Sequence, residues 1–151
     1  SDVEQKEKFD RVDDSVCAVR SALEEGIVAG AGLALYNASK KIVGNDSDPD
    51  YNTACNIVRE AIVQPLIQIL DNAGIKAENI LSEINDNKKK NYGFDVKNEK
   101  FGDLFALGVI DPLKVTKNAL VNASSVATTI LSTNAIITHA RAGRQESNNE
   151  N

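Results

Sequence analysis

The stretch that decides the fold is RVDDSVCAVRSALEEGIVAGAGLAL, residues 11–35. Its first half places Val12, Val16, Val19 and Leu23 at alternating steps of four and three, with polar and charged residues between them. That spacing puts the apolar side chains on one face of a helix. Gly26 follows the stripe, and a residue without Cβ suits the position after the last helical turn. The sequence therefore predicts a long amphipathic helix that ends at Gly26.

A glycine-rich turn comes directly after this helix. Residues 27–29 form a short apolar step, and Gly30-Ala31-Gly32 then leads into a second predicted helix that starts near Leu33. Glycine permits close backbone approach and helix N-termini favour anions, so the turn could present N–H groups to a phosphate or a ribose. The same pattern is also typical of a plain helix-packing turn. The residues alone leave both interpretations open.

Three aspartates are candidates for chemistry. Asp13 and Asp14 lie on the first predicted helix, where they could act as general base or metal ligands, or simply belong to a solvated acidic face. Asp111 precedes Pro112, and this pair of residues is typical of the start of a helix. Asp111 could therefore cap a helix or act as a ligand.

The middle of the chain reads as helical. Asp48 followed by Pro49 predicts a helix start after a polar loop, and Pro65 is expected to kink this helix without ending it. Another helix is expected over residues 77–84. Around Tyr92 the helical periodicity fails, and the polar surroundings of residues 92–94 predict a hairpin.

The last part of the chain is predicted to hold one more long helix. It opens at Asp111-Pro112 and is followed by Asn134 to Thr138, whose β-branched residues predict a terminal strand. Residues 140–151 form a polar tail that we expect to be disordered. The fold class is therefore mainly α, with a short hairpin and a terminal strand.

The composition argues against several classes of function. The chain has 151 residues and a net charge of -5, which argues against a nucleic-acid or anionic-membrane surface. Cys17, Cys55 and His139 are too few and too far apart for a zinc site, so no metal set is expected and both cysteines are read as reduced. No apolar run approaches the roughly 20 residues that span a bilayer. We expect a soluble, intracellular protein.

Three motifs resemble the group I (GroEL-type) chaperonins. The run RVDDSVCAVRSALEEGIVAGAGLAL is similar to the family's R-V-E-D-A, R-A-A-V-E-E-G and V-A-G-G-G-V-A-L segments. The run NYGFDVKNEKFGDLFALGVIDPLKVTKNAL, from Asn91, is similar to N-Y-G-Y-N-A-A through G-I-L-D-P-x-K-V-T. Between them, the helix with Pro65 is similar to A-P-L-x-Q-I. The resemblance runs from about Lys6 to Thr138.

The resemblance implies a domain organisation. Residues 1–26 would be the intermediate-domain helix and hinge, residues 27–139 the C-terminal half of the equatorial ATPase domain, and residues 140–151 the tail. The first helix begins at residue 1 without an obvious capping residue, so we expect the chain to be part of a longer subunit. The apical domain and the phosphate-binding loop would lie outside it.

The resemblance also implies roles for individual residues. Asp14 matches the family's catalytic aspartate, and Gly26 lies at the hinge, across which Glu25 is expected to pair with Lys117. The residues that match nucleotide-contacting positions are Gly30, Ala31, Gly32, Asp95, Val96, Lys97, Val109 and Asp111. Of these, Asp111 would contact the ribose and Val109 the adenine.

Some positions depart from the family pattern. Ala31 replaces a glycine, and its Cβ would cost about 1–2 kcal/mol in a left-handed conformation. Val96 and Lys97 replace small residues at the base edge, which puts that contact in question.

The function implied by the resemblance is ATP-driven protein folding. The full-length parent would use ATP with Mg²⁺ and K⁺, and its partners would be identical subunits in a single or double heptameric ring, a cochaperonin and unfolded client proteins. Its location would be the cytoplasm, or alternatively a mitochondrial or plastid matrix. The chain alone is expected to lack ATPase activity and to self-associate. The alternative is a helical scaffold module that has lost ATP chemistry.

Overall fold

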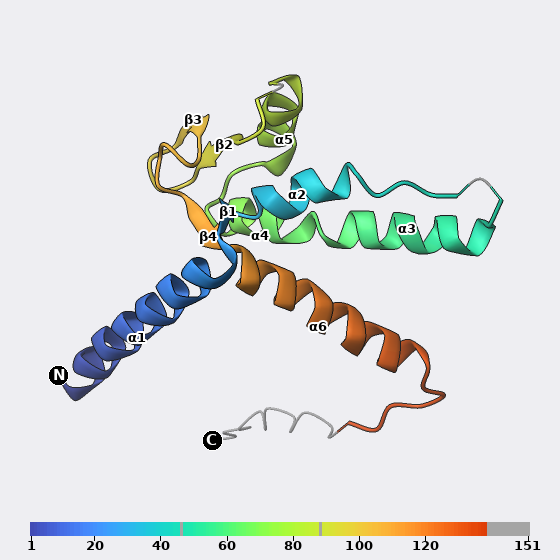
Figure 1. The fold of residues 1–151 in the computed structure, drawn as a ribbon, viewed down its shortest axis with the longest axis horizontal. Coiled ribbons are helices and arrows are strands. Elements are labelled where there is room, and N and C mark those ends of the chain that lie inside the picture. Colours follow the sequence, from blue (N-terminus) through green and yellow to red (C-terminus); the bar gives the residue numbers. More distant parts are fainter. Residues whose placement is uncertain (46, 88, 139–151) are drawn as a thin grey trace, which may run out of the picture.

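The computed structural model describes residues 1–45, 47–87 and 89–138. Two long helices, α1 (Asp2–Glu25) and α6 (Leu113–Leu131), extend in different directions from a central junction, as Figure 1 shows. The remaining elements lie on the other side of this junction. In chain order they are β1 (Ile27–Ala29), α2 (Leu33–Ser39), α3 (Pro49–Ala61), α4 (Gln64–Asn72), α5 (Ala77–Asp86), β2 (Tyr92–Asp95), β3 (Lys100–Asp103) and β4 (Ile110–Pro112). The prediction of a mainly helical fold with a short hairpin is confirmed.

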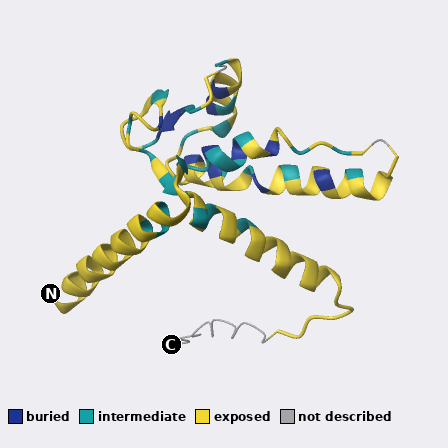
Figure 2. Ribbon diagram, in the orientation of Figure 1, coloured by how far each residue is buried: buried dark blue, intermediate teal, exposed yellow. Residues whose placement is uncertain are grey.

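Helix α1 has a complete N-terminal cap, which the sequence analysis missed. The Ser1 hydroxyl accepts from the backbone N–H of Glu4, and the Glu4 side chain accepts in return from the N-terminal amino group. This reciprocal arrangement is a capping box, and its Ser-x-x-Glu signal is visible in the sequence. The helix ends before Gly26, as predicted, but none of its residues is buried (Figure 2). Its apolar stripe is therefore open in this chain, with Leu23 84% exposed.

Helices α3 and α4 correct one prediction. Asp48 caps α3 as expected, since its Oδ1 accepts from the N–H groups of Asp50 and Tyr51 at 3.0 and 3.1 Å. Pro65, however, does not kink a continuous helix, because α3 ends at Ala61 and α4 begins at Gln64. Proline has no N–H to offer the carbonyl four residues earlier, so it is best placed in the first turn of a new helix.

Two small antiparallel sheets connect the helices. In one, β2 pairs with β3, which is the predicted hairpin. In the other, β1 pairs with β4 and sets Val28 opposite Asp111. Asp111 is therefore not the cap of the last helix, as the sequence had predicted. It lies in a strand, and α6 starts after Pro112 without a side-chain cap.

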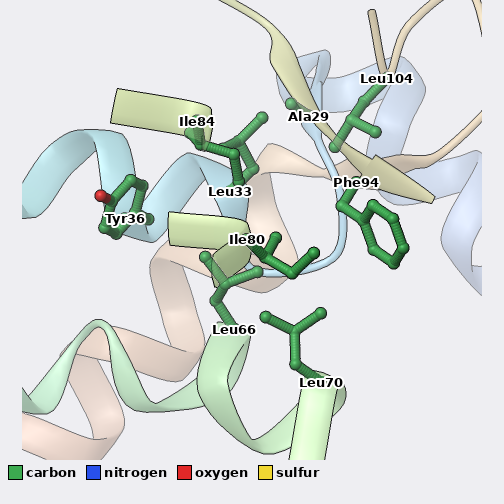
Figure 3. Close-up of a cluster of buried hydrophobic side chains, with 9 residues drawn as sticks. All are labelled: Ala29, Leu33, Tyr36, Leu66, Leu70, Ile80, Ile84, Phe94 and Leu104. Atoms are coloured by element: carbon green, nitrogen blue, oxygen red, sulfur yellow. The ribbon is translucent and has the colours of Figure 1, made fainter. Parts of the chain in front are cut away.

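The core lies between α2, α4, α5 and the inner strands (Figure 3). Leu33, Leu70 and Leu104 are its most deeply buried side chains, each at most 1% exposed. Full burial of a leucine is worth about 1.5–3 kcal/mol, so these three fix how α2 and α4 meet the loop after β3. The other members of the cluster are Ala29, Tyr36, Leu66, Ile80, Ile84 and Phe94.

The C-terminal part corrects another prediction. Residues 134–138 form no strand, and Ile137 is 99% exposed. A strand requires a partner for its backbone groups, and no strand among the described residues pairs with this segment. The predicted disordered tail, residues 140–151, lies outside the described residues. Within the described part of the chain, no helix is both long and apolar enough to cross a membrane.

Candidate functional site

The pairing of β1 with β4 brings two distant parts of the sequence together. Val28 lies opposite Asp111 and Ala29 opposite Ile110. Just beyond this ladder, the Gly30 N–H donates to the carbonyl of Val109 at 2.9 Å. The structure therefore places the Gly30–Gly32 turn beside Val109 and Asp111, all residues singled out from the sequence.

The turn itself is tightly packed. A Cβ on Gly32 would lie 2.8 Å from the backbone nitrogen of Leu66, and the φ of Gly32 is +76°. Only glycine meets both conditions without strain, because left-handed backbone and close backbone approach both disfavour a Cβ. Ala31 also has a positive φ, of 52°. The left-handed conformation considered for this alanine is thus present, at a cost of about 1–2 kcal/mol.

A surface hollow of about 350 Å³ opens beside the turn. Its walls come from β1, α2, α4, β4 and α6, and most of them are apolar. Its lining residues are Ala29, Gly32, Ala34, Leu35, Pro65, Ile69, Asp111, Pro112, Val115, Thr116 and Ala119. This volume is at the lower end of what ligand sites in proteins enclose. Among the described residues that line the hollow, only Asp111 has a charged side chain, and burial raises the pKa of its carboxyl.

The sequence analysis missed most of the walls of this hollow. Pro65 and Ile69 come from α4, and Val115, Thr116 and Ala119 from α6. The spacing of 65 and 69, and of 115 and 119, places each pair on one face of its helix. That spacing indicates a shared face, but the sequence holds no signal that these two faces meet at the same hollow.

Asp95, Val96 and Lys97 take no part in the hollow. The Asp95 carboxylate is buried, and it accepts from the Asn98 side-chain amide at 2.6 Å and from the N–H groups of Lys97 and Asn98. These hydrogen bonds, led by that from the Asn98 side chain, lower the pKa of Asp95. Asp95 therefore organises the turn between β2 and β3, while Val96 packs against the core.

Asp14 is exposed and lies away from the hollow. It precedes Gly26 by twelve positions on α1, which corresponds to about 18 Å along the helix axis. Helix α1 runs outward from the junction (Figure 1). The structure therefore does not bring Asp14 to the glycine turn in this arrangement of α1.

Two ion pairs join the end of α1 to the start of α6. Lys117 donates to Glu25, the pair that the family resemblance implies, and Lys114 donates to Glu24. The hydrogen bond from Lys114 lowers the pKa of Glu24. The sequence held a signal for the second pair. Glu24 and Glu25 are adjacent at the end of one helix, and Lys114 and Lys117 lie about one turn apart on another. Between the helices, Gly26 has a φ of +86°, and a Cβ there would meet no atom within 4 Å.

The residues fit a nucleoside better than a metal. A mostly apolar hollow with one carboxylate can hold a planar base and accept hydrogen bonds from sugar hydroxyls. Within residues 1–45, 47–87 and 89–138, no group of three His, Cys, Asp or Glu side chains is arranged to hold a metal ion.

Comparison with known protein families agrees with the motifs. Residues 1–141 match the model of the TCP-1/cpn60 chaperonin family, which covers nearly the whole chain. The match includes both halves of the β1–β4 junction, the hairpin and the two long helices. The chain belongs to the TCP-1/cpn60 chaperonin family.

Proposed function

We propose that this chain is part of a group I chaperonin subunit that folds proteins with the energy of ATP, and that it supplies the nucleoside wall of the ATP site. The observation that carries the proposal is the junction of the glycine turn with Asp111 and Val109 across the β1–β4 pair. Membership of the chaperonin family supports it.

The proposed contacts follow from the chemistry of the hollow. The Asp111 carboxylate accepts hydrogen bonds from the ribose hydroxyls, and the apolar walls from α4 and α6 exclude water around the base. Of the Gly30–Gly32 turn, Gly32 lines the hollow and would border the sugar, whereas Gly30, Ala31 and Val109 are not among the lining residues. Asp95 and Lys97 contribute less than their family positions imply, because the Asp95 oxygens are already bonded within their own turn.

The phosphates and their cations need groups from outside the described residues. No metal-binding cluster is found among the described residues, so Mg²⁺ and K⁺ would be held with the help of other parts of the subunit. Positioning the phosphates supplies most of the catalysis in phosphoryl transfer. We therefore expect the isolated chain to hydrolyse ATP at a negligible rate.

The catalytic role of Asp14 requires α1 to move. Rotation about Gly26 would swing Asp14 from its present exposed position toward the phosphates, where its carboxylate would orient the attacking water. Gly26 can absorb such a rotation because it has no Cβ. The ion pairs Glu24–Lys114 and Glu25–Lys117 hold the present orientation and must adjust when α1 swings.

The proposed partners are those of a ring chaperonin: identical subunits in a heptameric ring, a cochaperonin and unfolded client proteins, in the cytoplasm or an organelle matrix. Residues 134–138 would add a strand to a neighbouring subunit. The exposed apolar faces of α1 and α6 are available to cover other parts of the assembly.

The decisive experiment uses the full-length subunit assembled into rings. Asp14→Asn should slow single-turnover ATP hydrolysis by about 10²–10⁴-fold while calorimetry with Mg-ATP gives near-normal binding. Asp13→Asn is the matched control, since it removes the same charge from the adjacent position and should leave hydrolysis unchanged. Unchanged hydrolysis in Asp14→Asn would refute the catalytic assignment. Absence of any heat of binding in the unmutated ring would instead favour the scaffold alternative.

A further inference from the structure

The hollow beside the glycine turn is lined by only two polar side chains among the described residues, those of Asp111 and Thr116. Asp111 is the proposed partner of the ribose. The walls that remain for the base are apolar, and they come from α4 and α6 through Pro65, Ile69 and Val115. Apolar walls of this kind recognise a flat ring by its shape and exclude water from it.

Asp95 is engaged within its own turn. Its Oδ2 accepts from the Asn98 side-chain amide at 2.6 Å, and its Oδ1 accepts from the N–H groups of Lys97 and Asn98 at 3.0 and 3.2 Å. The residue is only 4% exposed. Because both oxygens are engaged and almost none of the residue reaches the surface, Asp95 offers no accessible acceptor to an adenine amino group.

The backbone of the glycine turn also has partners within the fold. The Gly30 N–H donates to the carbonyl of Val109 at 2.9 Å, and the Gly30 carbonyl accepts from the Leu33 N–H at 3.0 Å. The Gly32 carbonyl accepts from the Tyr36 N–H at 3.1 Å. These groups already have the hydrogen bonds that a packed backbone requires, so they hold the turn together and do not read a base.

The Thr116 hydroxyl can serve either base. It reaches the carbonyl of Pro112 only at 3.4 Å, which is long for a hydroxyl hydrogen bond, so it can turn toward a ligand. A hydroxyl both donates and accepts. Thr116 can therefore donate to the O6 atom of guanine or accept from the amino group of adenine, and it favours neither.

We propose that this hollow is permissive for the base, so that the assembled subunit binds GTP and ATP with similar affinity. The inference rests on the proposed function, since it takes the hollow to be the nucleoside site. Adenine and guanine differ at one edge, where adenine carries an amino donor and guanine a carbonyl acceptor. Only a donor or an acceptor fixed at that edge distinguishes them, and the described lining of the hollow supplies none.

The rest of the subunit is the other source of a group that could read the base. In the proposed function it holds the phosphates and their cations, and these are the same for ATP and GTP. A site with a fixed hydrogen-bonding group rejects the wrong analogue by about 10⁴–10⁵-fold. A base-reading group from that part would therefore appear as a strong preference for one nucleotide.

The test uses the full-length subunit assembled into rings. Titration calorimetry with Mg-ATP and with Mg-GTP gives the two dissociation constants under the same conditions. We expect GTP to bind within about tenfold of ATP. A larger preference for either nucleotide would overturn the permissive site and leave the proposed function intact. Absence of binding by both nucleotides would instead refute the proposed function, and this inference with it.

Two variants separate recognition by shape from recognition by hydrogen bonds. Ile69 is 37% exposed on the wall of the hollow, and Ile69→Ala should weaken ATP and GTP by the same factor, about tenfold. Lys97→Ala removes an exposed ammonium from the turn that holds Asp95 and should change the ratio of the two affinities by less than about twofold. A larger change of this ratio in either variant would contradict the proposal, because it would reveal a contact specific to one base.

Discussion

Replacement of Gly32 by alanine tests the packing of the turn. The φ of Gly32 is +76°, and a Cβ there would lie 2.8 and 2.9 Å from the backbone N and Cα of Leu66 at the start of α4. The left-handed backbone costs about 1–2 kcal/mol. The contact with backbone atoms adds about 1–3 kcal/mol, because neither the turn nor α4 can yield without disturbing the core. Gly32→Ala should therefore lower the free energy of unfolding by about 2–5 kcal/mol.

Gly74→Ala is the matched control. The φ of Gly74 is +73°, almost the same as that of Gly32, but a Cβ there meets no atom within 4 Å. This variant should show only the backbone cost, and the difference between the two variants isolates the contact with Leu66. Urea unfolding followed by circular dichroism measures both, and a difference of about 2 kcal/mol shifts the midpoint by about 1 M. Equal midpoints would refute the close packing of the turn on α4.

Two further predictions concern single side chains. Ala31→Gly should raise the free energy of unfolding by about 1 kcal/mol, because relief of the left-handed strain exceeds the added entropy of the unfolded chain. Glu99 has a φ of 50° in the exposed hairpin, so Glu99→Gly should raise the free energy of unfolding by a similar amount. Urea unfolding measures both variants, and a loss of stability in both would contradict this account. Burial raises the pKa of Asp111 above its ordinary 3.8, so its ionisation opposes folding and stability falls as the pH rises through the raised pKa. The pKa of Asp95 is lowered, so its contribution is present above the unfolded pKa and is lost as the pH falls through the folded one. Urea unfolding measured from acidic to neutral pH tests both shifts. At neutral pH, Asp111→Asn should be more stable than the unmutated chain and Asp95→Asn less stable. A change of stability with the same sign in both variants would contradict these shifts.

The helices could be predicted from the sequence where local signals decide them. Asp48-Pro49 predicted a helix start, and the Asp48 carboxylate caps α3. Asp111-Pro112 carries the same local signal, yet there Asp111 is held in β4 by its pairing with Val28. The two dipeptides do not differ in propensity. The two aspartates have different roles because only Asp111 has a partner strand, β1, and that strand lies far away in the chain.

The candidate site shows the same division between local and distant information. The glycine turn, Val109 and Asp111 were identified through motifs, but the sequence does not state that they touch. Their contact depends on β1 and β4, two strands of three residues each, too short for alternation to identify them. The walls from α4 and α6 were missed for the same reason, because a helix face is visible in the sequence and its neighbour is not.

The segment of residues 134–138 extends this reasoning to a strand that does not form. Its β-branched residues favour an extended conformation, but propensity alone cannot stabilise a strand whose N–H and C=O groups have no partner. Strand β1 presents the converse case, because it is ordered where β4 supplies its backbone groups with a partner. Whether a strand forms thus depends on the presence of a partner as much as on the sequence of the strand.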